Sequence, residues 1–304
     1  MTAGAAPPAG RRAGLGAAAV LAGYLLLAPS LYLLGPFALL ALLSRPRTTR
    51  ELIWLVLASA GVAASLAGDQ TLVPQLLRTG GLLMSAAFVL LSLRSSRSVV
   101  TRILWALALT MGGLLIWGLV WGVTWVDVER AFTEGLRADW QAWAQSRPGD
   151  PDLQLFVQRG QEMAPKLARL MMPGLLALEA MAGCALAWVW HHRIAAAPLG
   201  PPPGRFRNFR FNDHLVWGAI FTLGSLVLPL PPLARTIAAN LLIVWVGLYT
   251  VRGLAVIAAI FEQAPAHLRL LAMGLASPIC AVLGLADTWL DFRGRLVPPA
   301  PGGA

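Results

Sequence analysis

The sequence predicts an all-α protein: a polytopic transmembrane helical bundle of about eight or nine helices, with an amphipathic extracytoplasmic segment. Of the 304 residues, 57% are hydrophobic and only 12% are charged, and the mean hydropathy is +0.67. This balance is far more apolar than that of a soluble domain. Several uncharged stretches also approach the length of about 20 residues that a helix needs to cross about 30 Å of hydrocarbon.

The first apolar region, residues 14–43, is interrupted at Ala28-Pro29-Ser30 and again at Gly35-Pro36. Because proline removes a helical hydrogen bond and restricts the residue before it, we expect a helix of about 14 residues and a second short one there, one or both of them tilted, partly re-entrant or shielded by neighbouring helices. The further predicted spans are residues 51–67, 76–93, 103–123, 170–190, 214–230, 237–262 and 268–290.

Arginines concentrate in the loops 44–50, 94–102 and 191–213. Because basic loops face the cytoplasm, we expect a multi-pass protein of the bacterial cytoplasmic (inner) membrane with its N-terminus inside. The arginines of these short loops account for the net charge of +10. We therefore expect no nucleic-acid partner. Nine crossings would put the C-terminus outside, whereas one short first helix that fails to cross would put it inside.

We expect one transmembrane domain, residues 13–296, between disordered tails at 1–12 and 297–304. It contains a basic, proline-rich cytoplasmic loop at 194–213 and an extracytoplasmic amphipathic insertion at 124–169. The insertion is either a helix lying on the outer membrane surface or a lid over an outward-facing cavity. Its apolar stripe, at spacings of three and four, consists of Phe132, Leu136, Trp140 and Trp143.

Polar side chains inside the predicted spans are the candidate functional residues, because a charge there costs about 2.5–3.5 kcal/mol on insertion scales. One hypothesis is a polar cavity that binds a small molecule or an ion, lined by Glu179, Asn240, Arg252 and Asp287. The alternative is an interhelical ion pair that fixes packing, between Arg252 and either Asp287 or Glu179. Asp291, Arg293 and Arg295 are expected at the interface, with an i,i+4 ion pair between Asp291 and Arg295.

The sequence carries no phosphate loop, no HExxH, no GxSxG and no paired-cysteine metal site. Cys184 and Cys280 lie within apolar segments and predict no disulfide. His191 and His192 are adjacent and lack an accompanying acid or thiol, so they do not predict a metal site. We therefore expect neither an enzyme nor a cofactor.

Several stretches together resemble the YybS-like family of predicted bacterial membrane proteins, a family of unknown function. LGLADTWLDFRGR (283–295) is similar to the family's closing signature, carried here by Gly284, Asp287, Asp291 and Arg293. Arg252 stands where the family often has glutamine, which favours a local salt bridge at that position. The other matching stretches are PFALLALLSRPR (36–47), MPGLLALEAMAG (172–183), RFRNFRFNDHLVW (205–217) and NLLIVWVGLYTVRGLAVI (240–257).

That family is similar in membrane fold to the S components of energy-coupling-factor transporters, which bind vitamins and pair with an ATPase module through a transmembrane partner. The resemblance implies a transporter-like, small-molecule-binding membrane component. Its partners would be the lipid bilayer, a small-molecule ligand and an energy-coupling transmembrane or ATPase module. The alternative is a non-transporting scaffold or envelope assembly factor that docks a partner through residues 124–169 or 191–213.

Overall fold

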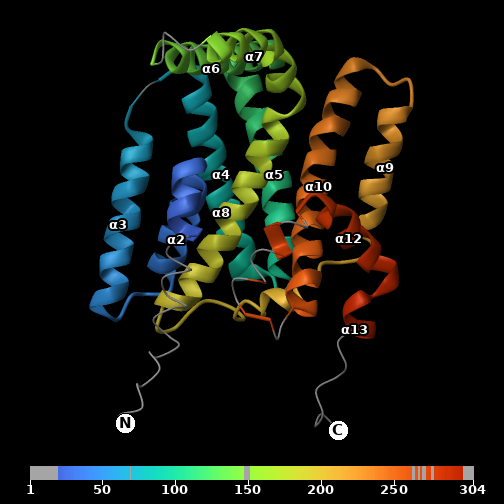
Figure 1. Ribbon diagram of the computed structural model, residues 1–304. Helices are drawn as coiled ribbons and strands as arrows, with labels where there is room; N and C mark the ends of the chain where they lie inside the picture. Colours follow the sequence, from blue (N-terminus) through green and yellow to red (C-terminus); the bar gives the residue numbers. More distant parts are fainter. Residues whose placement is uncertain are drawn as a thin grey trace, which may run out of the picture. The chain divides into compact units, whose positions relative to one another are not determined.

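A computed structural model describes residues 20–68, 70–146, 151–261, 264–265, 268, 272–274 and 277–296. These residues form helices and no strand, which confirms the predicted fold class (Figure 1). The described helices long and apolar enough to cross a membrane are α3 (Thr49–Leu66), α4 (Leu72–Arg94), α5 (Val99–Trp121), α8 (Met172–Ile194) and α10 (Pro232–Ile260). The predicted tails, 1–12 and 297–304, lie outside the described residues.

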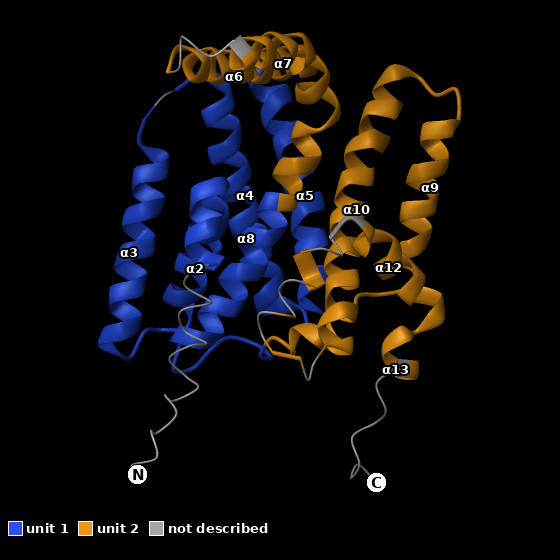
Figure 2. Cartoon of the chain, viewed as in Figure 1, with its two compact units in different colours: residues 1–121, 179–202 blue, residues 122–178, 203–304 orange. Residues whose placement is uncertain are grey.

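The chain forms two compact units (Figure 2). Unit 1 comprises residues 1–121 and 179–202, and unit 2 comprises residues 122–178 and 203–304. Helix α8 begins in unit 2 and continues into unit 1. Each unit has its own packed interior.

In unit 1, the short helix α2 (Leu31–Leu43) packs against α3 and α4, and α4 packs against α5. The expected break at 28–30 is present, because residues 20–27 form a separate helical segment before Pro29. The buried apolar side chains shared by α2, α3 and α8 are Leu33, Phe37, Ala41, Ala58, Ala187 and Ile194.

The break expected at Gly35-Pro36 was wrong, since Pro36 lies inside α2. Pro36 has no N–H to donate to the carbonyl of Tyr32, one turn earlier. Helix α8 approaches at that point, where a Cβ on Gly183 would lie 2.6 Å from the Tyr32 oxygen. Helix α2 therefore continues through Pro36 at a point where a neighbouring helix packs closely against it.

In unit 2, α6 (Trp125–Gln145) and α7 (Pro151–Leu170) form an amphipathic hairpin. The predicted stripe contributes to packing between them: Trp140 joins the buried cluster of Ala144, Leu153 and Val157, and Trp143 meets the Phe156 ring edge-on at 5.8 Å. Part of the apolar surface expected to face a membrane or a cavity is therefore used within the hairpin.

Helices α9 (Leu215–Val227) and α10 lie side by side, and the Trp245 indole donates a hydrogen bond of 3.2 Å to the Thr222 hydroxyl. Helix α12 (Ser277–Leu290) packs against α10. Its 14 residues extend about 21 Å and form the C-terminal part of the stretch expected to cross, 268–290, of which residues 269–271 and 275–276 lie outside the described residues.

The short helix α13 (Phe292–Leu296) follows α12, and Figure 1 shows it at the end of unit 2 opposite the α9–α10 turn. Arg293 of α13 bonds to carbonyl oxygens of residues 207 and 209, which precede α9. The end of the described chain therefore lies on the same side of unit 2 as the basic segment 205–213. This arrangement agrees with the alternative in which the C-terminus lies inside, together with the basic loops.

Candidate functional site

The site is built on a close approach between α10 and α12. A Cβ on Gly253 would collide with the carbonyl oxygen of Cys280, and a Cβ on Gly284 would collide with that of Tyr249. Only residues without a side chain allow two helix backbones to come so close. The contact brings Arg252 of α10 beside Asp287 of α12.

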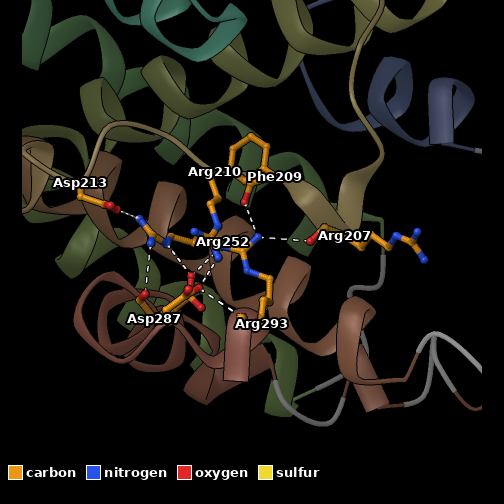
Figure 3. A network of polar contacts seen from close by, with 9 residues as sticks. Arg207, Phe209, Arg210, Asp213, Arg252, Asp287 and Arg293 are labelled. Carbon is orange, nitrogen blue, oxygen red and sulfur yellow. Dashed lines mark hydrogen bonds and ion pairs between the residues drawn. The ribbon is translucent and has the colours of Figure 1, made fainter. Parts of the chain in front are cut away.

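Arg252 and Asp287 form a buried ion pair (Figure 3). Arg252 donates from Nε to Asp287 Oδ2 at 3.0 Å and from Nη2 to the Asp287 carbonyl oxygen at 3.3 Å. Each residue is only 1% exposed. The sequence left Asp287 and Glu179 open as ion-pair partners of Arg252. In the structure, Arg252 pairs with Asp287.

Arg293 is the second arginine bound to Asp287. Its Nη2 lies 2.6 Å from Asp287 Oδ2, and its Nη1 donates to the carbonyl oxygens of Phe209 at 2.8 Å and Arg207 at 3.2 Å. Figure 3 shows these contacts converging from α13 and from segment 205–213. Arg293, which the sequence placed in the closing signature, thus joins the helix pair to the segment before α9.

Asp213 completes the cluster from that segment. Its Oδ1 lies 2.6 Å from Arg252 Nη1, and its side chain is 60% exposed. The Phe211 ring lies 5.4 Å from the Arg252 guanidinium carbon. Sequence reasoning did not include Asp213 in the site, although one signal was present: it is the single acid among the arginines of residues 191–213.

The expected ion pair between Asp291 and Arg295 was wrong, because Asp291 pairs instead with Arg210 of the loop. Asp291 has a φ of 42°, in the left-handed region, where it ends α12 and redirects the chain into α13. This turn points its carboxylate toward segment 205–213.

We name the four residues Asp213, Arg252, Asp287 and Arg293 the α10–α12 charge cluster. Its formal charge is balanced, with two arginines against two carboxylates. Two buried polar atoms, Asp287 Oδ1 and Arg293 Nε, have no hydrogen-bond partner among the described residues. Buried charges are strongly destabilising once a partner is removed, so each member depends on the others.

Asn240 lies elsewhere on α10, twelve residues and about 18 Å before Arg252. Its Oδ1 accepts a hydrogen bond of 2.8 Å from the Gly174 N–H, and its Nδ2 donates to the carbonyl oxygens of Arg169 at 3.2 Å and Thr236 at 2.9 Å. Asn240 therefore ties the start of α8 and the end of α7 to α10, and the structure does not bring it to the cluster.

Glu179 belongs to unit 1, whereas the other three predicted residues belong to unit 2. Its carbonyl oxygen accepts a hydrogen bond of 2.7 Å from the Tyr24 hydroxyl, and its side chain is partly exposed. Of the four residues predicted to line one cavity, the structure thus brings together Arg252 and Asp287.

Long apolar helices that carry a network of buried charges define a polytopic helical membrane protein. The chain belongs to the family described as Predicted membrane protein (DUF2232), which it matches over residues 16–288. The match includes Gly284 and Asp287 and ends before Asp291 and Arg293. No curated protein and no solved structure matches the chain.

Proposed function

We propose that this protein is a small-molecule-binding component of a membrane transport system, of the kind that the similarity to S components implies. In this proposal it lies in the bacterial cytoplasmic membrane with its N-terminus inside, carries out no catalysis, and works with an energy-coupling transmembrane or ATPase module. The apolar helices and the membrane-protein family support the general class.

The observation that carries the proposal is the unequal burial of the Arg252–Asp213 pair. Arg252 is 1% exposed, but the Asp213 side chain that neutralises it is 60% exposed. A ligand carboxylate can replace Asp213 at Arg252 Nη1 while the buried bond to Asp287 stays intact. When Asp213 moves away, the two positive charges of Arg252 and Arg293 are balanced by the single negative charge of Asp287. The remaining positive charge favours an anionic ligand.

The proposal is tested by thermal unfolding of the purified chain with a panel of carboxylate-bearing vitamins and metabolites. A compound present at 100 times its Kd stabilises the protein by about 2.7 kcal/mol. Asp213→Asn removes the internal competitor, so we expect it to tighten binding by about tenfold, which is about 1.4 kcal/mol. Glu134→Gln removes an exposed acid of α6 and serves as the control.

A second candidate function, a non-transporting scaffold or envelope assembly factor, is favoured by the bonds from Arg293 to the carbonyls of Arg207 and Phe209. These bonds fix the basic segment 205–213 as a surface for a partner. If no compound stabilises either the natural chain or Asp213→Asn, and crosslinking recovers envelope-assembly proteins without an ATPase module, the scaffold role replaces the transport role.

A further inference from the structure

Unit 1 contains a buried arginine that the proposed function does not use. Arg102 lies in the first turns of α5 and is 2% exposed. Its guanidinium carbon lies 4.3 Å from the centre of the Trp188 ring of α8. Its Nε has no hydrogen-bond partner, and Arg102 forms no ion pair with any described residue.

Glu51, a buried carboxylate of unit 1, does not pair with Arg102, because its oxygens accept hydrogen bonds from other donors. Its Oε2 accepts bonds of 2.8 Å from the Arg47 and Thr48 N–H groups, and its Oε1 accepts one of 2.6 Å from the Ala196 N–H. Stacking on tryptophan offsets only part of the cost of burying a cation. Arg102 therefore lacks a counter-charge in the described part of unit 1.

The surroundings of Arg102 also favour an anion. The N-terminal end of a helix carries a partial positive charge, so a cation in the first turn of α5 has the unfavourable sign. Arg94, the last residue of α4, and Arg97, in the segment that leads into α5, are both exposed and add positive charge. No acid occurs between residues 94 and 102.

Trp188 is held in place as a platform for Arg102. The Phe88 ring meets it edge-on at 6.2 Å, and the His192 ring lies 4.6 Å away. A Cβ on Gly200 would lie 3.0 Å from its ring, so the segment after α8 also lies against it. An arginine stacked on a fixed indole keeps the edge of its guanidinium available for the two oxygens of a phosphate or carboxylate.

We propose that Arg102, on its Trp188 platform, binds the phosphate of an anionic membrane lipid from the leaflet that contacts the basic loops. Arg102 lies three residues after the start of α5, about 4.5 Å along the helix, so it is near the end of α5 that follows the basic segment 94–98. Basic sites between helices on the cytoplasmic side are the ordinary places where lipid headgroups bind. The lipid supplies the counter-charge that the described chain lacks.

The test uses the full chain in bilayer discs of phosphatidylcholine, with and without an equimolar share of phosphatidylglycerol. Native mass spectrometry counts the lipids that the protein retains, and melting temperatures are measured on the same samples. Arg102→Met removes the charge, Arg102→Lys keeps the charge without the planar fork, and Arg94→Met is the matched control at an exposed arginine. A further arm adds inorganic phosphate to discs of phosphatidylcholine alone.

We expect the natural chain to retain phosphatidylglycerol and to melt at a higher temperature with it. Arg102→Met should weaken retention by at least about tenfold, the usual effect of losing one charge-assisted bond, whereas Arg94→Met changes it little. If inorganic phosphate alone reproduces an Arg102-dependent shift, the site binds phosphate and its source is soluble.

The proposal is overturned if Arg102→Met retains the lipid as well as the natural chain does, or if Arg94→Met loses as much. A measurement on the natural chain alone can also overturn the proposal. If the chain retains phosphatidylcholine and phosphatidylglycerol equally and inorganic phosphate has no effect, Arg102 only packs against Trp188 and binds no anion. The α10–α12 charge cluster takes no part in these measurements, so the outcome is independent of the transport proposal.

Discussion

Arg252 and Arg102 are two buried arginines of one membrane protein that lie in different surroundings. Arg252 contacts Asp287 and Asp213, and Arg293 shares Asp287 with it. Arg102 has an aromatic ring in place of a carboxylate. The first arrangement supplies its own counter-charges, so each member depends on the others; the second has no counter-charge among the described residues.

The largest effect is expected from Asp287→Asn, which keeps the shape of the side chain but leaves two arginines buried without their shared carboxylate. We expect a loss of about 3–5 kcal/mol in the free energy of unfolding, measured by chemical denaturation in mild detergent. A loss below about 1 kcal/mol would contradict the described cluster, since surface ion pairs are worth that little.

A smaller loss is expected from Gly284→Ala, because the new methyl group overlaps the Tyr249 carbonyl oxygen and separates α12 from α10. Overpacking of this kind costs about 1–3 kcal/mol. Gly112→Ala is the matched control, since nothing lies within 4 Å of a Cβ there; it should stabilise α5 by about 0.5–1 kcal/mol. Equal effects of the two changes would show that the helix contact is looser than described.

Arg102→Met should change the unfolding free energy by less than about 1 kcal/mol in detergent without anionic lipid, because it removes an unpaired charge and keeps most of the side-chain volume. Chemical denaturation of Arg102→Met and Asp287→Asn under the same conditions compares the loss of unfolding free energy in the two arginine environments. A loss as large as that of Asp287→Asn would mean that Arg102 is fully compensated within the chain.

The smallest effect concerns the start of α6, outside both arginine environments. Hydrogen bonds from the Thr124 hydroxyl and N–H lower the pKa of Asp127. A lowered pKa contributes stability that is present above the ordinary aspartate value and is lost as the pH falls below it. The protection factors of amides in the first turn of α6, which are corrected for the pH dependence of chemical exchange itself, should fall over that acidic range, and Asp127→Asn should remove this fall.

Length and apolarity predicted the long helices because both are properties of local sequence. The rule that a buried charge needs a partner or a function gave an ion pair of Arg252 as one of two hypotheses, with Asp287 as one of its two possible partners. It did not identify Asp213 or Arg293 as members, because their contacts depend on how segment 205–213 folds onto distant helices. Arg102 was counted with the loop arginines, since its burial depends on Trp188, 86 residues later in the chain.

The two prolines near the N-terminus also show that local sequence does not predict what depends on contacts with distant segments. Pro29 separates two helical segments as expected, but Pro36 does not end α2. The two positions carry the same local penalty. At Pro36, Gly183 of α8 approaches the Tyr32 carbonyl closely, a tertiary contact that no local pattern reveals.

The order of the cluster residues along the chain has a consequence for biosynthesis. A ribosome releases Asp213 before Arg252, and Asp287 and Arg293 only 35 and 41 residues after Arg252. When α10 leaves the ribosome, Asp213 is therefore the first cluster carboxylate available to neutralise Arg252, and the exposed member serves as its early counter-ion. A chain that stops before residue 287 keeps this provisional pair but lacks the buried one, so completion of the last helix determines when the α9–α10 hairpin becomes fixed.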